Sequence, residues 1–203
     1  LLTQVPHRLI NRELATHGLE VSPARLGVVM CFLSPTEAAA SRSVVTEAIE
    51  AEGMHLLFWR SVPTDPSVLG DHARLVLPLI EQAIVTSETE GADFERALYL
   101  SRKRIERADV PGLSIPSASS RTVVYKGLFT ASKISDFYWD LRDPDFETAF
   151  AIFHQRYSTN TFPSWDNAQP FRTLAHNGEI NTIQSNRSWM LAREKAATPG
   201  VWG

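Results

Sequence analysis

One uninterrupted apolar run, Leu26–Leu33, constrains the fold more than any other feature of this sequence. A strand with one face in water alternates apolar and polar residues, and this run has no polar position. It therefore predicts a β-strand that is buried on both faces. Such a strand has to lie between two other layers of structure. The run is less than half of the roughly 20 residues that a membrane-spanning helix needs, so no membrane segment is predicted.

Segments typical of helices and strands alternate along the rest of the chain. This interleaving predicts a layered fold that mixes both types, although it leaves the strand directions open. From periodicity and turn signals, we predict helices within 1–20 (from Leu9, Ile10 and Leu14, after a short extended entry), at 35–53, 132–141 and 183–197, strands at 55–63, 121–129 and 148–158, a loop at 112–120, and either type at 79–87.

Composition and charge exclude several classes of protein. Hydrophobic residues make up 43% of the chain and charged residues 21%, which are values of a globular protein and exclude wholesale disorder. The net charge is −3, so no nucleic-acid partner is expected. Four basic residues between 102 and 107 are interpreted as a solvated face for the same reason.

The single cysteine, Cys31, excludes an internal disulfide framework and a zinc site built from cysteines. A reducing compartment is therefore expected. Because Cys31 lies inside the apolar run, we interpret it as a core residue and not as a nucleophile.

Polar side chains that could bind a substrate or take part in a reaction are concentrated in residues 153–182. Asn177-Gly178 is the strongest short signal for a tight turn, and its two N–H donors also fit an oxyanion hole. Arg156 follows a predicted strand; it fits either a surface ion pair or a two-pronged grip on a carboxylate. The residues alone leave both alternatives open.

The remaining candidates are interpreted as structural. His154 and His176 lack the spacing of metal ligands, so no metal site is predicted, and His154 is expected to be a hydrogen-bonded core residue. Lys126, after the apolar TVVY, fits either a buried ion-pair partner or an exposed charge at a strand end, and the second is favoured. Trp165 and Trp189 are expected to pack in the interior.

The chain as a whole resembles a known family. The block HQRYSTNTFPSW (154–165) with AQPFRTLAHNGEINT (168–182) carries the resemblance, supported by LLTQVPH (1–7), FERALYLSRKRIE (94–106), and SSRTVVYKGLF with FYWDL (119–141). These segments are similar to the glutamine amidotransferase domain of the glutamate synthase large chain. That domain belongs to the class II, N-terminal-nucleophile amidotransferases.

The resemblance implies roles for five residues. Arg156 is similar to the arginine that holds the α-carboxylate of the substrate glutamine, and Thr159 and Asn160 lie on the same substrate-binding loop. Asn177 and Gly178 resemble the oxyanion pair. The family nucleophile is an N-terminal cysteine whose own α-amino group acts as the base.

The sequence departs from the family pattern at the nucleophile, because residue 1 is Leu. We expect residues 1–203 to be a partial amidotransferase domain that lacks the first strand with its cysteine and a C-terminal part with the carboxylate for the substrate amino group. On its own, this stretch is expected to be inactive.

The fold implied by the resemblance is α+β, the four-layer αββα sandwich of N-terminal-nucleophile hydrolases. The implied function is hydrolysis of L-glutamine, with ammonia passed to a synthase domain of the same chain for reductive amination of 2-oxoglutarate. No cofactor is expected in these residues. FMN and an iron–sulfur cluster are expected elsewhere in the protein, and FAD and NADPH in a small flavoprotein subunit. The expected location is the cytoplasm, or the plastid in a plant.

Two alternatives stay open at this point. One is another class II enzyme, such as a phosphoribosyl or an asparagine-forming amidotransferase. The other is a non-catalytic domain that binds glutamine or a partner.

The oxyanion role of Asn177 is testable in the intact enzyme. Asn177→Ala should lower kcat for glutamine hydrolysis by roughly 10²–10³, the usual loss for one oxyanion donor. Steady-state release of glutamate measures this. An unchanged kcat would remove Asn177 from the role.

Overall fold

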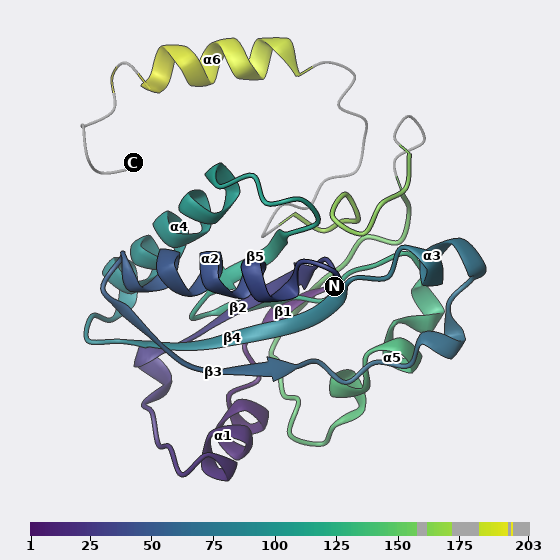
Figure 1. Cartoon of the computed structure of the whole chain (residues 1–203), viewed down its shortest axis with the longest axis horizontal. Coiled ribbons are helices and arrows are strands. Elements are labelled where there is room, and N and C mark those ends of the chain that lie inside the picture. Colours follow the sequence, from purple (N-terminus) through teal and green to yellow (C-terminus); the bar gives the residue numbers. More distant parts are fainter. Residues whose placement is uncertain (158–161, 172–182, 195, 197–203) are drawn as a thin grey trace.

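The chain folds around two antiparallel β-sheets (Figure 1). The computed structural model describes residues 1–157, 162–171, 183–194 and 196. Helices and strands alternate along the chain, and the strands form two antiparallel sheets. This confirms the predicted α+β class. No described helix is long and apolar enough to span a membrane.

The larger sheet has four strands in the order β3-β4-β2-β5. One of its two inner strands, β2, is the apolar run of the sequence, and all of its residues are buried, as predicted. Because side chains alternate between the two faces of a strand, β2 contributes Val28 and Met30 to one core and Val29 and Cys31 to another. The strands are β2 (Leu26–Leu33), β3 (Met54–Ser61), β4 (Leu79–Ser87) and β5 (Ser114–Ser119).

Two helices, α2 (Ala38–Glu50) and α4 (Gly91–Arg107), cover one face of this sheet. Phe94 and Leu98 of α4 pack against Cys31 and its neighbours. Lys103 and Arg104 of α4 lie at the surface and pair with Glu106 and Glu52, which supports their interpretation as a solvated face. Arg102 also pairs with Glu106, but its side chain is only 19% exposed and its Nη1 atom is buried.

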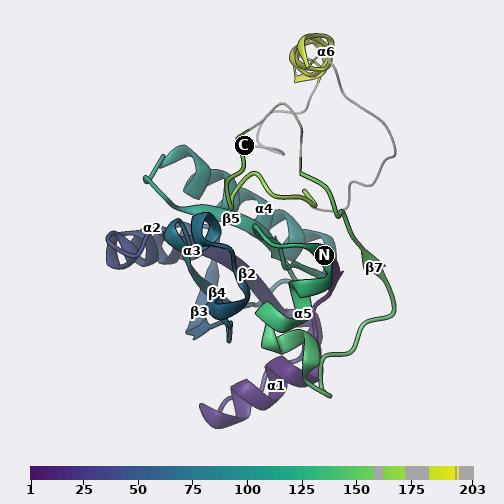
Figure 2. The ribbon, with the colours of Figure 1, turned by 90° about the vertical axis from the view of Figure 1, so that its right-hand side faces the viewer.

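The smaller sheet has three short strands in the order β6-β1-β7, with bounds Thr122–Val124, Leu2–Gln4 and Ala151–Ile152. Together with two helices it covers the other face of the four-stranded sheet; Figure 2 shows α2 on one side of that sheet and β7 and α5 on the other. The first helix, α1 (His7–Thr16), buries Leu9, Ile10 and Leu14 as predicted. The second helix is α5 (Ile134–Phe137). The remaining helices are α3 (Asp71–Leu75) and α6 (Gln184–Glu194).

A sharp corner joins the two sheets between β5 and β6. The Glu95 carboxylate of α4 accepts hydrogen bonds from the Ser120 backbone N–H at 2.6 Å and from the Ser119 hydroxyl at 3.0 Å. The Ser119 hydroxyl oxygen in turn accepts from the Thr122 N–H at 3.2 Å. A carboxylate that accepts several hydrogen bonds holds this turn more firmly than hydrogen bonds among the serines alone would.

A buried polar network connects the larger sheet with the segment that follows β6. Arg60 of β3 donates two hydrogen bonds, of 2.8 and 2.7 Å, to the two carboxylate oxygens of Asp140. The Tyr125 hydroxyl donates to the same carboxylate at 2.9 Å, and Gln82 of β4 accepts from Arg60 at 3.1 Å. Burial alone lowers the pKa of Arg60, but the hydrogen bonds and the charge of Asp140 outweigh burial, so the pKa is raised.

Three sequence-based expectations need correction. Residues 112–120 were expected to form a loop, yet 114–119 form the edge strand β5, where Pro116 needs no ladder hydrogen bond. The strand predicted at 148–158 is only two residues long. Trp189 was expected to pack in the interior, yet it lies on α6, which has no buried residue, and it is 76% exposed.

The Arg60–Asp140 pair generates a stability prediction. Asp140→Asn removes the charge and leaves the buried Arg60 guanidinium with only the more distant Glu13 carboxylate, at 3.7 Å, so it should lower the free energy of unfolding by about 3–5 kcal/mol. Urea unfolding followed by tryptophan fluorescence measures this. Asp136→Asn is the matched control, since Asp136 pairs with Arg142 at the surface and its change should be much smaller. Equal shifts for the two variants would contradict a special role for the network.

Candidate functional site

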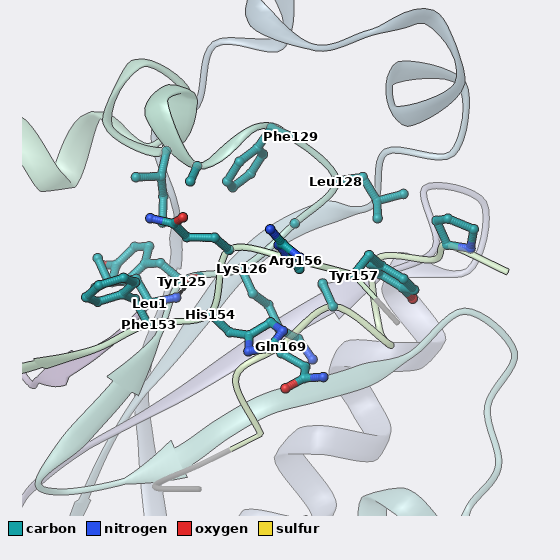
Figure 3. A pocket seen from close by; sticks show the side chains of 16 residues that line it. Leu1, Tyr125, Lys126, Leu128, Phe129, Phe153, His154, Arg156, Tyr157 and Gln169 are labelled. Carbon is teal, nitrogen blue, oxygen red and sulfur yellow. Dashed lines mark hydrogen bonds between the residues drawn. The ribbon is translucent and has the colours of Figure 1, made fainter. Parts of the chain in front are cut away.

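A cavity of about 360 Å³ lies where β1, the segment after β6 and the segment after β7 meet (Figure 3). Its size is within the range of small-molecule sites. The lining combines apolar side chains, such as Phe129 and Phe153, with polar ones. The polar and ionisable lining residues are Tyr125, Lys126, His154, Gln155, Arg156, Tyr157 and Gln169.

Strand pairing places the beginning of β1 at this cavity. The ladder between β1 and β6 continues beyond the strands, because the Leu1 nitrogen donates to the Tyr125 carbonyl oxygen at 2.7 Å and the Tyr125 N–H donates back at 2.8 Å. Lys126 and Gly127 follow directly and leave the sheet to line the cavity. The site is therefore built on a sheet end, where binding residues are commonly found.

Arg156 lies on the segment after β7 and reaches the same cavity. Figure 3 shows its side chain in the middle of the lining residues, with Leu128 and Phe129 on one side and His154 and Gln169 on the other. Within 1–157, 162–171, 183–194 and 196, no carboxylate pairs with Arg156 and none lines the cavity. The ionised side chains of the cavity are thus cationic, which favours an anionic ligand group.

Lys126 contradicts the expectation of an exposed strand-end charge, because only 5% of it is exposed. Its ammonium group donates to the Asp166 carbonyl oxygen at 2.7 Å and lies 5.0 Å from the centroid of the Phe171 ring. Burial lowers the pKa of Lys126 to about 8, against a smaller opposing effect of Asp166. Its position directly after the apolar stretch TVVY was the only sign of burial in the sequence.

Gly127 allows the chain to pass close to a buried tryptophan. A Cβ atom at Gly127 would lie 2.4 Å from Cζ3 of Trp165 and 2.6 Å from Cε1 of Phe129, closer than any non-bonded contact permits. Trp165 is 4% exposed and donates from its indole nitrogen to the Ala73 carbonyl oxygen at 3.2 Å. This confirms that Trp165 packs in the interior. Its ring also fixes the position of the backbone at Gly127, which lines the cavity.

The structure describes only some of the candidate residues that the sequence predicted. Of the five residues carried over from the family, Arg156 lies in the cavity, whereas Thr159, Asn160, Asn177 and Gly178 lie outside the described residues. The roles of all five residues stay predictions.

Cys31 is fully buried, and burial raises the pKa of its thiol far above the usual range, which confirms a core role. His154 is exposed at the cavity and is not a core histidine. No group of three or more metal-ligating side chains occurs in the part of the chain that the structure describes.

Comparison with known proteins gives one consistent result. The model of the family "Glutamine amidotransferases class-II" matches residues 1–203. The chain is 42% identical to a chloroplastic ferredoxin-dependent glutamate synthase of Oryza sativa over 212 residues, 100% of this chain. It is 43% identical over 199 residues (94% of this chain) to the NADPH glutamate synthase large chain of Azospirillum brasilense, and 41% identical over 203 residues (96%) to that of Bacillus subtilis. The match spans 13% of the length of each relative.

The buried Lys126 generates a prediction for the pH dependence of stability. The amine loses its proton near pH 8 when folded but near 10.4 when unfolded. Between these values the unfolded chain binds more protons, so folding becomes more favourable as pH rises. Compared with Lys126→Met, the wild type should gain up to about 3 kcal/mol of unfolding free energy from pH 7 to 10.5. Denaturant unfolding at several pH values measures the difference, and a constant difference would show that Lys126 titrates normally.

Proposed function

The chain belongs to the class II glutamine amidotransferases, and we propose that it is the glutamine-hydrolysing domain of a glutamate synthase. The three relatives compared above, at 41–43% identity, are glutamate synthases, which favours this member of the class over the phosphoribosyl and asparagine-forming enzymes. Residues 1–203 are then part of a longer protein, with the nucleophilic cysteine and the remaining substrate contacts supplied by other parts of it.

The observation that carries this proposal is the position of Arg156. Its guanidinium has no described acidic partner, lies in a cavity of about 360 Å³, and shares that cavity with Lys126 and no carboxylate side chain of the described residues. A free, planar guanidinium suits two parallel hydrogen bonds to a carboxylate. The α-carboxylate of glutamine is the ligand group that the family relationship suggests for it.

The proposed chemistry combines binding of the glutamine α-carboxylate with reaction at its side-chain amide. Arg156 holds the α-carboxylate, with Thr159 and Asn160 nearby on its loop. A cysteine thiolate delivered from outside this chain segment attacks the side-chain amide carbon, and Asn177 and Gly178 stabilise the oxyanion that forms. The C–N bond then breaks and releases ammonia. Water hydrolyses the thioester and releases glutamate.

The other parts of the proposal concern the longer protein. Ammonia passes to a synthase domain of the same chain, which makes a second glutamate from 2-oxoglutarate. The FMN, the iron–sulfur cluster and a flavoprotein subunit with FAD and NADPH are proposed for regions outside residues 1–203, as the family resemblance implies. A plastid location is proposed for a plant source, by analogy with the chloroplastic relatives, and a cytoplasmic one otherwise.

Arg156→Lys tests the proposed site in the full-length enzyme. Lysine keeps the charge but loses the two-pronged geometry, so KM for glutamine should rise roughly 10- to 100-fold, while kcat changes less. Steady-state glutaminase kinetics give both constants.

Arg104→Lys is the matched control, because Arg104 pairs with Glu52 on the surface of α4, away from the cavity. An unchanged KM in Arg156→Lys would show that Arg156 does not hold the substrate. Absence of glutamine hydrolysis by the wild-type enzyme would overturn the proposed function itself.

A further inference from the structure

The cavity has a wall that comes from a separate segment, residues 162–171. Pro163, Ala168 and Gln169 of this segment line the cavity. Packing of Trp165 attaches the segment to the core, and the Ser164 N–H donates to the Tyr157 hydroxyl oxygen at 2.9 Å. These contacts fix the beginning of the segment, so the part that follows Trp165 depends on other contacts.

Lys126 adds contacts to that later part, beside the buried Ala168 and the 2.9 Å hydrogen bond from the Asn167 side-chain amide to the Ser164 hydroxyl. Its ammonium group reaches the carbonyl oxygen of Asp166 at 2.7 Å and the ring of Phe171, at 5.0 Å from its centroid. At the other end, the Lys126 carbonyl oxygen accepts a hydrogen bond of 2.8 Å from the buried Tyr138 hydroxyl. The side chain therefore bridges a rigid point of the core and the wall of the cavity.

Stability does not explain a charge at this position. A buried ammonium that has one backbone acceptor is desolvated without a paired carboxylate, and an apolar side chain of similar volume is commonly as stable or more stable there. Asp166 contributes its backbone oxygen, and its residue is exposed, so the pairing is not a buried ion pair. A charge that destabilises the fold and lines a candidate site points to a role in that site.

The charges around Lys126 lie on two sides. His154 and Arg156 line the proposed glutamine cavity. Arg102, Glu106, Asp109 and Asp166 line a smaller cavity of about 280 Å³ on its other side, and Lys126 lines both. The repulsion from Arg102 adds to burial in disfavouring the charged form. The protonation of Lys126 therefore depends on the charged groups that line the two cavities.

We infer that Lys126 is a positioning residue of the proposed glutamine site, whose protonated side chain holds segment 162–171 in place as the wall opposite the strand end. The inference rests on the proposed function and goes beyond it, because Lys126 acts through the wall and not by touching the reacting atoms. Loss of the side chain frees the wall and weakens substrate binding. Loss of its proton weakens the hydrogen bond to Asp166 and the contact with Phe171.

The test compares Lys126→Met, Lys126→Arg and Lys103→Met in the full-length enzyme, with glutaminase kinetics from pH 7 to 9.5. Lys103→Met is the matched control, since Lys103 pairs with Glu106 on the outer face of α4. The readout is the ratio of each variant's KM to that of the wild type at the same pH, because ionisation of glutamine itself cancels in this ratio. The melting temperature of each variant is measured alongside.

At pH 7 we expect KM to rise about tenfold in Lys126→Met, more than kcat falls, with a melting temperature no lower than that of the wild type. This ratio should decline toward pH 9.5, as the wild type loses its own proton. Lys126→Arg, which stays charged, should bind like the wild type at pH 7 and better than the wild type at pH 9.5. Lys103→Met should follow the wild type throughout.

Two results would overturn the inference. One is a KM ratio near one for Lys126→Met at every pH. The other is a lower melting temperature of Lys126→Met with a loss of activity that does not vary with pH, which would make Lys126 a purely structural residue. In both cases glutamine hydrolysis by the wild type, with a raised KM in Arg156→Lys, would leave the proposed function intact.

Discussion

The described structure depends on one buried ion pair, between Arg60 and Asp140. Arg60 belongs to the sheet that forms the centre of the molecule, and Asp140 belongs to a short turn 80 positions later. Tyr125, whose hydroxyl joins the same carboxylate, is the residue from which the chain turns away from the smaller sheet and enters the cavity. The pair thus connects the sheet with the backbone that carries Lys126 and Gly127. A misplaced Asp140 would disturb the core and the site together.

The sequence predicted the parts of the fold that follow from local periodicity. The predictions of the strand Leu26–Leu33 and of the buried face of α1 were correct, because the apolar pattern of each segment fits only one type of secondary structure. Residues 114–119 were missed because serines and a proline resemble a loop, while their strand pairing depends on β2, far away in the sequence. The family resemblance supplied the order of layers, which periodicity cannot give.

The site shows the same division. The sequence singled out Arg156 by its residue type and its neighbours, and the structure brings it to a cavity that its own segment only partly forms. Lys126 was misjudged, because its burial comes from Asp166 and Phe171, which lie 40 and more positions further along the chain. A lysine after an apolar strand is usually exposed. Only tertiary contacts distinguish the rare buried one, and such contacts are not visible in a single sequence.

The position of β1 between β6 and β7 has a consequence for biosynthesis. Leu1 pairs with Tyr125, which is 124 positions later, and Leu2 also pairs with Ile152. At translation rates of about 5–20 residues per second, β1 leaves the ribosome roughly 6–25 s before its first partner strand. During that interval its exposed edge is open to wrong pairing. β1 therefore stays without its native partners until most of this region has been made.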